Sequence, residues 1–447
     1  MASSELHREA SSRAGQRFWI ETLGCPKNAV DSDKVAASLL GDGLTAARTA
    51  ADADLVVVNT CAFIEAARQE SIDTVLALSD ARKDGARLVV TGCLAERYGG
   101  ELAEALPEAD AVIGFAGEGS ISEVVLRRPP KGGPRDLLEL PRPAPAAPWA
   151  YVKVAEGCDR TCAFCAIPSF RGKQRSRSPE SILGEARSLV AGGAREIVLV
   201  AQDLASYGRD VGASGALAPL LRSLDGLSGE GLARVRLLYL YPSQVRDPLI
   251  GTMLDLETAV PYFDLSLQHA SEPLLKRMRR WGSGERFLSM IDDIRRREPD
   301  AAFRSSFIVG FPGETEEDHE ELMGFLDAAA LDWAGLFPFS PEEGTAAAGM
   351  GSAVVDDVVK ERLGELSVLQ DRITQAARDA LVGTRVEVLV DGKEGGVPIG
   401  RTHREAPEID GVVRFADDRG ASPLSPGTVV TAEVVSAIGP DLVAVAA

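Results

Sequence analysis

The chain of 447 residues is too long for one ordinary hydrophobic core, which predicts two or three domains. Its hydrophobic content of 45% and charged content of 26% are typical of a soluble globular protein, and no apolar run reaches the length of a membrane span. The net charge of −19 disfavours a large nucleic-acid footprint, which needs a basic face, and suits a basic protein partner better.

The first fifteen residues, Met1–Gly15, are polar and rich in alanine and serine. They lack the apolar centre of a signal peptide, so we expect a disordered tail and a cytoplasmic protein. Six cysteines are few for a disulfide-stapled extracellular protein of this length. Metal or redox chemistry is the better interpretation of these cysteines.

Residues 16–128 repeat a strand-then-helix pattern three times. Apolar segments at 18–23, 54–60 and 86–92 predict strands, and helical patterns such as Ile64–Leu78 follow them. Near-continuous apolar strands that alternate with helices are typical of a parallel sheet covered on both faces. This region is therefore predicted to be an N-terminal parallel-sheet α/β domain.

A cysteine follows the end of each of these three strands, at Cys25, Cys61 and Cys93. The cysteines are spaced by 36 and then 32 residues, close to the length of one strand–helix–strand unit. The carboxyl ends of parallel strands share one edge of the sheet, where α/β proteins bind their ligands. We therefore expect three thiolates to converge there, a number that can hold a 4Fe–4S cluster with its fourth iron open.

A proline-rich linker at residues 129–149 precedes a second group of cysteines. Cys158, Cys162 and Cys165 lie within eight residues, at the spacing C-x3-C-x2-C, directly after an apolar alternation. Soft thiolates at such spacing favour zinc or an iron–sulfur cluster. A structural zinc ion needs a fourth ligand nearby, and the next Cys or His is His269, so we favour a 4Fe–4S cluster with one open iron.

Residues 150–354 alternate between strand and helix patterns. The predicted strands are Tyr151–Ala155, Glu196–Val200, Val235–Tyr239, Phe263–Leu267, Phe303–Val309 and Trp333–Phe339. Six β/α units predict a partial (β/α)6 barrel, with polar motifs such as Gln202-Asp203 and Gln268-His269 at the strand ends where barrel active sites lie. We interpret the compact basic run Lys276–Arg280 as a solvated helix face.

A charged helical stretch at residues 355–382 leads to a third domain at residues 383–447. Its predicted strands are Arg385–Val390, Gly411–Phe415, Thr428–Val435 and Leu442–Ala446, separated by turns rich in glycine and aspartate. Short strands of this number predict a small antiparallel β-barrel of the OB-like kind. Such barrels often bind nucleic acids, yet acidic residues outnumber basic ones between Glu387 and Asp441.

The C-x3-C-x2-C loop, with Phe164 before its last cysteine, resembles that of the radical S-adenosylmethionine (SAM) superfamily. Two cysteine triads followed by a small barrel resemble the radical SAM methylthiotransferases, in which that barrel is called a TRAM domain. The resemblance runs from about Gln16 onward. Segments similar to the branch that acts on ribosomal protein S12 are Leu23–Asn28 with Asp31-Ser32, Asn59–Ile64, Ile167–Gly172, Ser306–Glu314 and Glu405–Gly411, whereas Ala62 stands where that branch often has Gly.

The resemblance implies two 4Fe–4S clusters and two molecules of SAM. Cys158, Cys162 and Cys165 would hold the cluster that shares its open iron with SAM, and Cys25, Cys61 and Cys93 would hold an auxiliary cluster carrying the sulfur. A radical formed from one SAM would remove hydrogen from the β-carbon of an aspartate of ribosomal protein S12. The second SAM would supply the methyl group, giving β-methylthio-aspartate.

The resemblance also implies residues near SAM and partners of the enzyme. Phe164 would pack near the adenine, while Gln202, Gln268 and Arg304 would lie at strand ends facing the SAM pocket. Gly310 and Gly313 would let the backbone approach SAM or would make a turn. The implied partners are ribosomal protein S12, free or in the small subunit, and a reduced donor such as flavodoxin or ferredoxin; we expect a monomer without membrane association.

Two other functions stay open at this point. The first is the same chemistry on tRNA, as a tRNA (adenosine) methylthiotransferase whose third domain binds the RNA. The second is a non-enzymatic, RNA-associated adaptor with two structural zinc sites. A strong salt dependence of tRNA binding favours the former, and a colourless zinc protein favours the latter.

Overall fold

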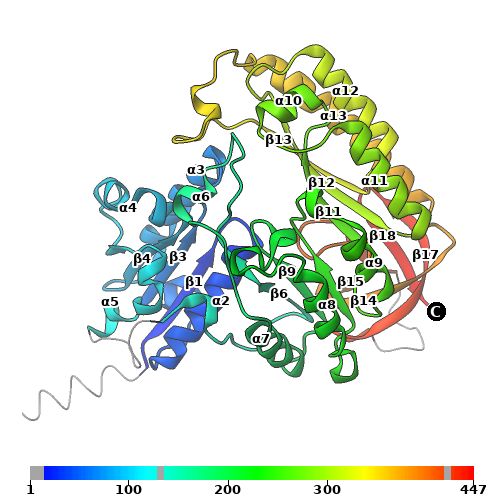
Figure 1. Cartoon of the computed structure of the whole chain (residues 1–447). Coiled ribbons are helices and arrows are strands. Elements are labelled where there is room, and N and C mark those ends of the chain that lie inside the picture. Colours follow the sequence, from blue (N-terminus) through cyan, green and yellow to red (C-terminus); the bar gives the residue numbers. More distant parts are fainter. Residues whose placement is uncertain (1–14, 128–134, 417–423) are drawn as a thin grey trace, which may run out of the picture. The chain divides into compact units, whose positions relative to one another are not determined.

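The computed structural model describes residues 15–127, 135–416 and 424–447 (Figure 1). The chain forms two compact units. One contains the described residues up to Pro143 together with Glu156–Asp159 and Cys165–Lys173, and the other contains Ala144–Ala155, Arg160–Phe164 and Gln174–Ala447. Residues 1–14 of the predicted tail and residues 129–134 of the predicted linker lie outside the described part. Within the described ranges, no helix is both long enough and apolar enough to span a membrane.

The first unit is built on a five-stranded parallel sheet with the order β2-β1-β3-β4-β5, as predicted from its apolar strands. Its strands are β1 Arg17–Thr22, β2 Thr45–Ala46, β3 Leu55–Thr60, β4 Arg87–Gly92 and β5 Ala111–Val112. Its helices are α2 Pro26–Gly41, α3 Glu65–Ala81, α4 Cys93–Ala105, α5 Glu123–Leu126 and α6 Ile167–Phe170. The two-residue edge strands β2 and β5 were not predicted, because they are too short to show a pattern.

Helices cover both faces of this sheet. Val56 and Val58 of β3 pack into one core with α3 and α4, while Leu55 and Val57 pack into a second core with α2 and α5. All six residues of β3 are therefore buried. This double burial is the physical reason that β3 is apolar without alternation.

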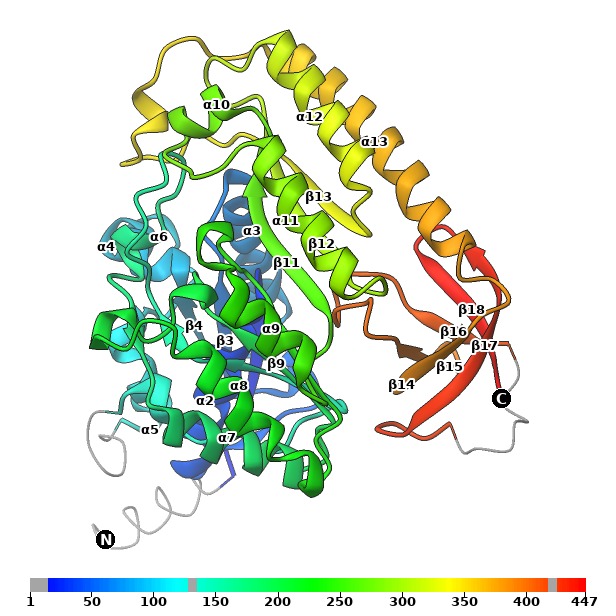
Figure 2. The ribbon, with the colours of Figure 1, turned by 45° about the vertical axis from the view of Figure 1, so that its right-hand side comes forward.

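The second unit contains six parallel strands flanked by helices. They are β6 Trp149–Lys153, β9 Glu196–Val200, β10 Arg234–Leu237, β11 Tyr262–Gln268, β12 Ala302–Val309 and β13 Trp333–Pro338, and two short strands are β7 Ala155–Glu156 and β8 Arg175–Ser176. The helices are α7 Pro179–Ala191, α8 Leu217–Asp225, α9 Asp247–Asp255, α10 Glu272–Arg277, α11 Gly284–Arg297 and α12 Glu316–Ala329. In Figures 1 and 2, helices α11, α12 and α13 (Asp356–Asp379) lie side by side next to β11–β13.

The six strands form an open curved sheet, which confirms the predicted partial barrel. Two ladders of three strands, β6-β9-β10 and β11-β12-β13, are joined by isolated parallel bridges from Val235 to Ala259 and from Leu240 to Leu265. The order therefore runs from β6 to β13 in sequence, as successive β/α units require. The carboxyl ends of all six strands lie at the same edge.

The C-terminal part is a closed five-stranded barrel in the order β14-β15-β16-β18-β17. Its strands are β14 Arg385–Glu394, β15 Val397–Arg401, β16 Val413–Phe415, β17 Val429–Ile438 and β18 Asp441–Ala446. The prediction missed β15, whose Pro398 and Gly400 are unusual inside a strand. It was also wrong in making the barrel wholly antiparallel, because β16 and β18 run parallel.

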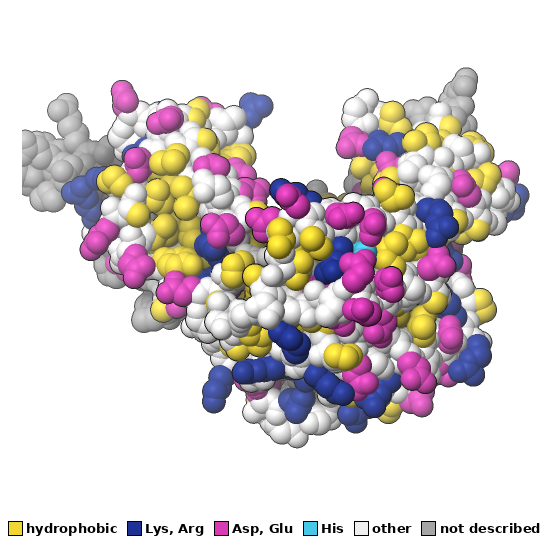
Figure 3. Space-filling model, turned by 90° about the horizontal axis from the view of Figure 1, so that it is seen from above, with side chains coloured by type: hydrophobic (Ala, Val, Ile, Leu, Met, Phe, Trp, Pro, Cys, Tyr) yellow, Lys and Arg dark blue, Asp and Glu magenta, His cyan; other side chains and the backbone are white. Residues whose placement is uncertain are grey.

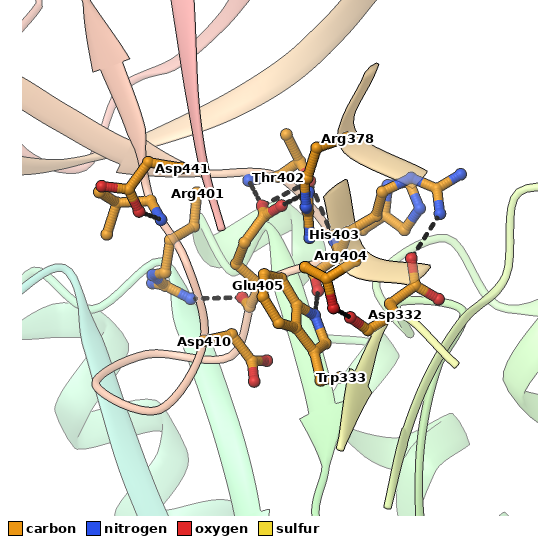
Figure 4. A network of polar contacts seen from close by, with 12 residues as sticks. Asp332, Trp333, Arg378, Arg401, Thr402, His403, Arg404, Glu405, Asp410 and Asp441 are labelled. Carbon is orange, nitrogen blue, oxygen red and sulfur yellow. Dashed lines mark hydrogen bonds and ion pairs between the residues drawn. The ribbon is translucent and has the colours of Figure 1, made fainter. Parts of the chain in front are cut away.

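A buried polar network fastens this small barrel to the six-stranded sheet within the second unit (Figure 4). Glu196 of β9 accepts hydrogen bonds from Arg236 Nε at 2.6 Å and from Arg401 Nη1 at 2.8 Å. Trp333 of β13 donates its indole N–H to the carbonyl of Arg404 at 2.7 Å, and Arg378 of α13 pairs with Glu405. The segment Glu405–Gly411, which resembles a family motif, therefore lies at an internal contact of this unit.

Candidate cluster sites

The structure brings Cys25, Cys61 and Cys93 to the carboxyl edge of the first sheet. Cys25 caps the N-terminus of α2, Cys61 directly follows β3, and Cys93 is the first residue of α4. A Cβ placed on Gly24 would lie 2.9 Å from Cys61 Sγ, so the Cys25 loop approaches Cys61 closely. Asn28 joins the three segments, because its Nδ2 donates to the carbonyls of Leu23 and Thr60 and its Oδ1 lies 3.7 Å from Cys93 Sγ.

The electrostatics of these thiols show that they influence one another. Burial raises the pKa of the Cys61 thiol to about 12, and like-charge repulsion from Cys25 and Cys93 adds to it. Burial also raises the pKa of Cys93. Burial acts in the same sense on Cys25, but the charges of Lys27 and Arg171 outweigh it and the pKa of that thiol is lowered. The thiols of Cys61 and Cys93 are buried and that of Cys25 is half-buried. Thiolates that repel one another in such surroundings need bound cations to be ionised together.

Arg171 directs its guanidinium group at this triad. Its Nε and Nη2 donate to Cys93 Sγ at 3.3 and 3.2 Å, and Nη2 also donates to Asn28 Oδ1 at 2.7 Å. Nη1 donates to Asp31 and Glu156. The side chain is 3% exposed, so its charge acts in a medium of low polarity.

The C-x3-C-x2-C loop is anchored by its flanks. The Cys158 N–H donates to the carbonyl of Gly172 at 3.0 Å. Gly157 has a φ of +76°, and a Cβ there would lie 2.1 Å from the carbonyl oxygen of Lys173, so only glycine fits. Cys158 and Cys165 belong to the first unit and Cys162 to the second.

In the second unit, Cys162 meets a buried arginine. Arg280 Nη1 donates to Cys162 Sγ at 3.4 Å, and its Nη2 donates to the carbonyl of Ser266. The Arg280 and Arg160 guanidinium carbons lie 4.0 and 3.7 Å from the centroid of the Tyr241 ring. Arg160 is fixed by Asp203, at 2.7 Å. Because Asp203 balances the charge of Arg160, the positive charge of Arg280 is the one that suits an anionic group beside this cysteine.

The donor sets fit iron–sulfur clusters. Among the residues described, no three His, Cys, Asp or Glu side chains are close enough to share one metal ion. In a 4Fe–4S cluster, however, each thiolate binds a different iron, so the sulfurs stand farther apart than around zinc. The first triad consists of thiolates alone and receives hydrogen bonds at one sulfur from Arg171. These features fit a cluster better than a single zinc ion.

The residues expected near SAM lie at several different places. Phe164 is half-buried and packs against the core of the second unit. Gln202 follows β9, and Gln268 is the last residue of β11, with a φ of +77° that is rare for a residue other than glycine. These two glutamines therefore lie at the carboxyl edge of the six-stranded sheet, as expected.

Arg304 corrects our expectation of its position. It is the third residue of β12, near the amino end of that strand, and it pairs with Asp264 at 3.1 Å and with Asp410 of the C-terminal part at 3.5 Å. The opposite edge of the sheet is where ligands of such barrels bind. Arg304 therefore belongs to the contact between the sheet and the small barrel.

Gly310 and Gly313 form a turn whose free side is filled by the chain itself. Both have positive φ, +82° and +80°. A Cβ on Gly310 would lie 2.5 Å from Val359, and one on Gly313 would lie 2.3 Å from the Arg277 guanidinium. Of the two interpretations of these glycines, the structure favours the turn.

Sequence reasoning missed three residues beside the cysteines. Arg171 was noticed only as part of a motif, and Tyr241 was not considered. The prediction of a solvated helix face holds for Lys276 and Arg279, which are exposed, but is wrong for Arg280. Arg280 is 9% exposed because α10 ends at Arg277 and the following turn directs this side chain inward. The position of Arg280 three residues beyond the end of α10 was the signal that its side chain need not lie on the exposed face of that helix.

Three family models match the chain. The model described as Uncharacterized protein family UPF0004 matches residues 17–114. That of the Radical SAM superfamily matches residues 152–326, and that of the TRAM domain matches residues 382–446. Together they cover the parallel sheet of the first unit, the six-stranded sheet and the C-terminal barrel.

Similar proteins include two of the same name. A ribosomal protein uS12 methylthiotransferase RimO from Saccharopolyspora erythraea is 43% identical over 471 residues, covering 97% of this chain and 96% of the relative. Its namesake from Moorella thermoacetica is 44% identical over 427 residues, covering 94% and 96%. A solved radical SAM methyltransferase, TsrM from Kitasatospora setae with cobalamin and a 4Fe–4S cluster bound, has a TM-score of 0.54 at 15% identity, covering 75% of this chain and 77% of its own. At that identity the likeness concerns the fold.

Proposed function

We propose that this chain, which belongs to the radical SAM family of ribosomal protein uS12 methylthiotransferases, inserts a methylthio group at the β-carbon of an aspartate of uS12. The observation that carries the proposal is the combination of two cysteine triads with likeness over nearly the whole chain. The convergence of Cys25, Cys61 and Cys93 at one sheet edge supports it, because a structural protein has no need of three thiols there.

In this proposal, Cys158, Cys162 and Cys165 hold one 4Fe–4S cluster and Cys25, Cys61 and Cys93 hold a second, auxiliary cluster. When bound, these cofactors supply the one-electron cleavage of SAM and the sulfur that is transferred. A second SAM donates the methyl group. We also propose that Phe164, Gln202 and Gln268 contact SAM, on the ground of their position in the loop and at the strand ends.

The chain itself contributes positioning. A carbon radical reacts with almost any C–H bond, so substrate and sulfur must be fixed before it forms. Arg280 presents positive charge beside Cys162, where a carboxylate can be held by charge-assisted hydrogen bonds. At the first triad, the buried thiols of Cys61 and Cys93 and the guanidinium of Arg171, which is 3% exposed, limit the access of water.

Charge supports a basic protein as the substrate. The chain carries a net charge of −19. On the face seen in Figure 3, acidic side chains lie over much of the middle of the molecule, and several basic side chains gather along its lower edge. A field of this sign steers a basic protein toward the enzyme and repels RNA. We further propose a cytoplasmic monomer of three domains, at residues 16–128, 150–354 and 383–447, that receives electrons from a flavodoxin or ferredoxin.

The test is mass spectrometry of ribosomal proteins and tRNA from cells with and without the gene. A methylthio increment on one aspartate of uS12, absent from the deletion strain and restored by the plasmid-borne gene, is the expected result. Loss of methylthio-adenosine from tRNA with unchanged uS12 would assign the chemistry to tRNA instead. No change in either would overturn the proposed reaction.

A further inference from the structure

In the function proposed above, Arg171 only limits the access of water, although its guanidinium touches the sulfur of one of the cysteines. We propose that Arg171 is a positioning residue that raises the reduction potential of the cluster on Cys25, Cys61 and Cys93 by donating two hydrogen bonds to the Cys93 sulfur. This inference rests on the proposed auxiliary cluster.

The contact with Cys93 is directed at the sulfur itself. Nε and Nη2 lie 3.3 and 3.2 Å from Sγ, within the usual range for hydrogen bonds to sulfur. The two donors approach from one planar group, which is the fork geometry that lysine lacks. Hydrogen bonds to cluster sulfurs are among the features that set the potential of an iron–sulfur centre.

Other groups of the first unit hold the guanidinium in this orientation. Asn28 Oδ1 accepts from Nη2 at 2.7 Å, and Asp31 Oδ2 accepts from both Nη1 and Nη2 at 3.2 Å. Both carboxylate oxygens of Glu156 accept from Nη1, at 2.9 and 3.0 Å. The Phe115 ring centroid lies 4.6 Å from the guanidinium carbon. Every nitrogen of the group therefore has a partner, so the two donors to sulfur are fixed before any cluster binds.

The sign of the effect follows from the charge change on reduction. Reduction adds one electron to the cluster, and the added negative charge spreads onto its cysteine sulfurs. A buried cation with two N–H groups on one sulfur stabilises the reduced form more than the oxidised form. Removing Arg171 would also remove the positive charge that balances Asp31, which is 2% exposed and acts on Cys93. The charge of Asp31 then disfavours the reduced cluster, so this effect also lowers the reduction potential.

The same side chain connects the triad to the C-x3-C-x2-C loop. Glu156, which Arg171 binds, stands two residues before Cys158, and Arg171 itself stands six residues after Cys165. Both flanks of that loop belong to the first unit. The Arg171–Glu156 ion pair therefore links the first triad to the start of the C-x3-C-x2-C loop.

The experiment isolates the auxiliary cluster in the full chain. A parent carrying Cys158→Ala, Cys162→Ala and Cys165→Ala is reconstituted without oxygen, and its iron is counted. Its one-electron reduction is then followed by electron paramagnetic resonance at set potentials. Arg171→Met and Arg171→Lys are compared with Arg135→Met, which removes a half-buried arginine of the same unit that pairs with Asp42.

We expect Arg171→Met to lower the ratio of reduced to oxidised cluster at a fixed potential at least tenfold, a shift of about 59 mV for a one-electron couple. Arg171→Lys keeps the charge and should lie between Arg171→Met and the parent. Arg135→Met should match the parent. A parental midpoint in Arg171→Met overturns the inference.

Two further outcomes are also decisive. If Arg171→Met does not assemble the cluster, the same titration is run on Arg171→Met with Asp31→Asn, which also removes the carboxylate that Arg171 binds. A parental midpoint in that variant overturns the inference, and a lowered one supports it. If the triple-alanine parent itself holds no iron, the proposed auxiliary cluster is wrong, and the inference fails with it.

Discussion

Cysteine side chains of the two triads have separate roles in the proposed function, and single substitutions distinguish them. Cys162 lies in the loop assigned to the cluster that binds SAM, and Cys61 follows β3 in the other triad. Thiolate ligands cannot be replaced by a methyl group without loss of the bound iron. Each triad can therefore be emptied without altering the residues of the other.

Cys162→Ala is expected to abolish the formation of 5′-deoxyadenosine from SAM, whereas Cys61→Ala should retain some cleavage without sulfur insertion. Both products are measured by liquid chromatography with mass spectrometry on anaerobically reconstituted protein. Iron content should fall by about four per chain in each variant. Normal methylthio product from either variant would contradict the assignment of the triads.

Arg280 gives a second prediction at the residue scale. Its buried guanidinium donates to Cys162, and its Nε has no hydrogen-bond partner among the described residues. A charge-assisted hydrogen bond contributes about 1.5–3 kcal/mol, so Arg280→Met should reduce SAM cleavage by roughly ten- to a hundredfold. The control is Arg286→Met, an exposed arginine stacked on Trp281. Equal cleavage rates in the two variants would argue against a role for Arg280.

At the scale of single elements, local backbone geometry determines where glycine is required, as the turn after β12 shows. The turn after β12 requires two residues with positive φ, Gly310 and Gly313, and packs against α13 through Val359. Glycine adopts such a conformation without strain, whereas other residues cost about 1–3 kcal/mol. Gly364, in contrast, is not required by the backbone or by packing. It lies in the interior of α13, and no atom is near the place of its missing Cβ.

Gly310→Ala should therefore lower the free energy of unfolding by at least about 1–3 kcal/mol, since a strained φ and a clash with Val359 add up. Gly364→Ala is the matched control and should raise it by up to about 1 kcal/mol, because alanine favours helix. Urea denaturation of the apoprotein measures both. A neutral Gly310→Ala would show that the turn relaxes easily.

At the scale of the whole molecule, the second unit depends on charges buried between its sheet and its small barrel. Glu196, with Arg236 and Arg401 on it, is fully buried in the middle of this contact. Burial would raise the pKa of this carboxyl, but the arginines lower it to about 2. Its folded pKa therefore lies below its unfolded value, so its stabilising contribution is present above pH 4.5 and is lost as the pH falls toward 2.

Glu196→Gln should lower the free energy of unfolding at pH 7 by roughly 3–5 kcal/mol, because it leaves the buried guanidinium of Arg236 without its carboxylate. Glu230→Gln, which breaks an exposed pair with Arg187, should cost less than about 1 kcal/mol. Both are compared by urea denaturation. The difference between Glu196→Gln and the parent should shrink below pH 4.5, and a constant difference would contradict this account.

Asp410 gives a pH dependence of opposite sign at the same contact. Burial raises its pKa to about 6, although Arg304 acts against the shift, and it accepts hydrogen bonds from Tyr262 and Ala406. Because the folded pKa exceeds the unfolded one, its contribution to stability is full below about pH 4 and is lost as the pH rises through 6.

Asp410→Asn does not titrate, so its stability relative to the parent should increase by roughly 2–3 kcal/mol between pH 4 and pH 7, at 1.36 kcal/mol per pKa unit. Paired urea titrations at these two pH values measure the change. Asp225→Asn, outside this contact, serves as the control. A stability difference independent of pH would show that Asp410 ionises normally in the folded protein.

Local patterns were sufficient for most of the strands and for the position of Cys25, Cys61 and Cys93 at strand ends. Apolar periodicity predicted β3, β4 and the six barrel strands, and the C-x3-C-x2-C spacing together with Cys25, Cys61 and Cys93 at strand ends predicted both triads. Each of these signals lies within one element or one repeated unit. Hydrophobic burial and strand direction then fix where the side chains go.

Tertiary structure alone decided which charged residues are buried and what they contact. Glu196 and Arg401 are 205 residues apart in sequence, and Arg171 and Cys93 are 78 apart. The sequence around Arg171, Arg280, Arg304 or Glu196 gives no sign of these partners, because a charge becomes buried only where distant segments supply its counter-charge. The spacing of the cysteines in the sequence therefore identified them as candidate ligands, whereas only the fold decided that Arg171 and Arg280 contact their sulfurs.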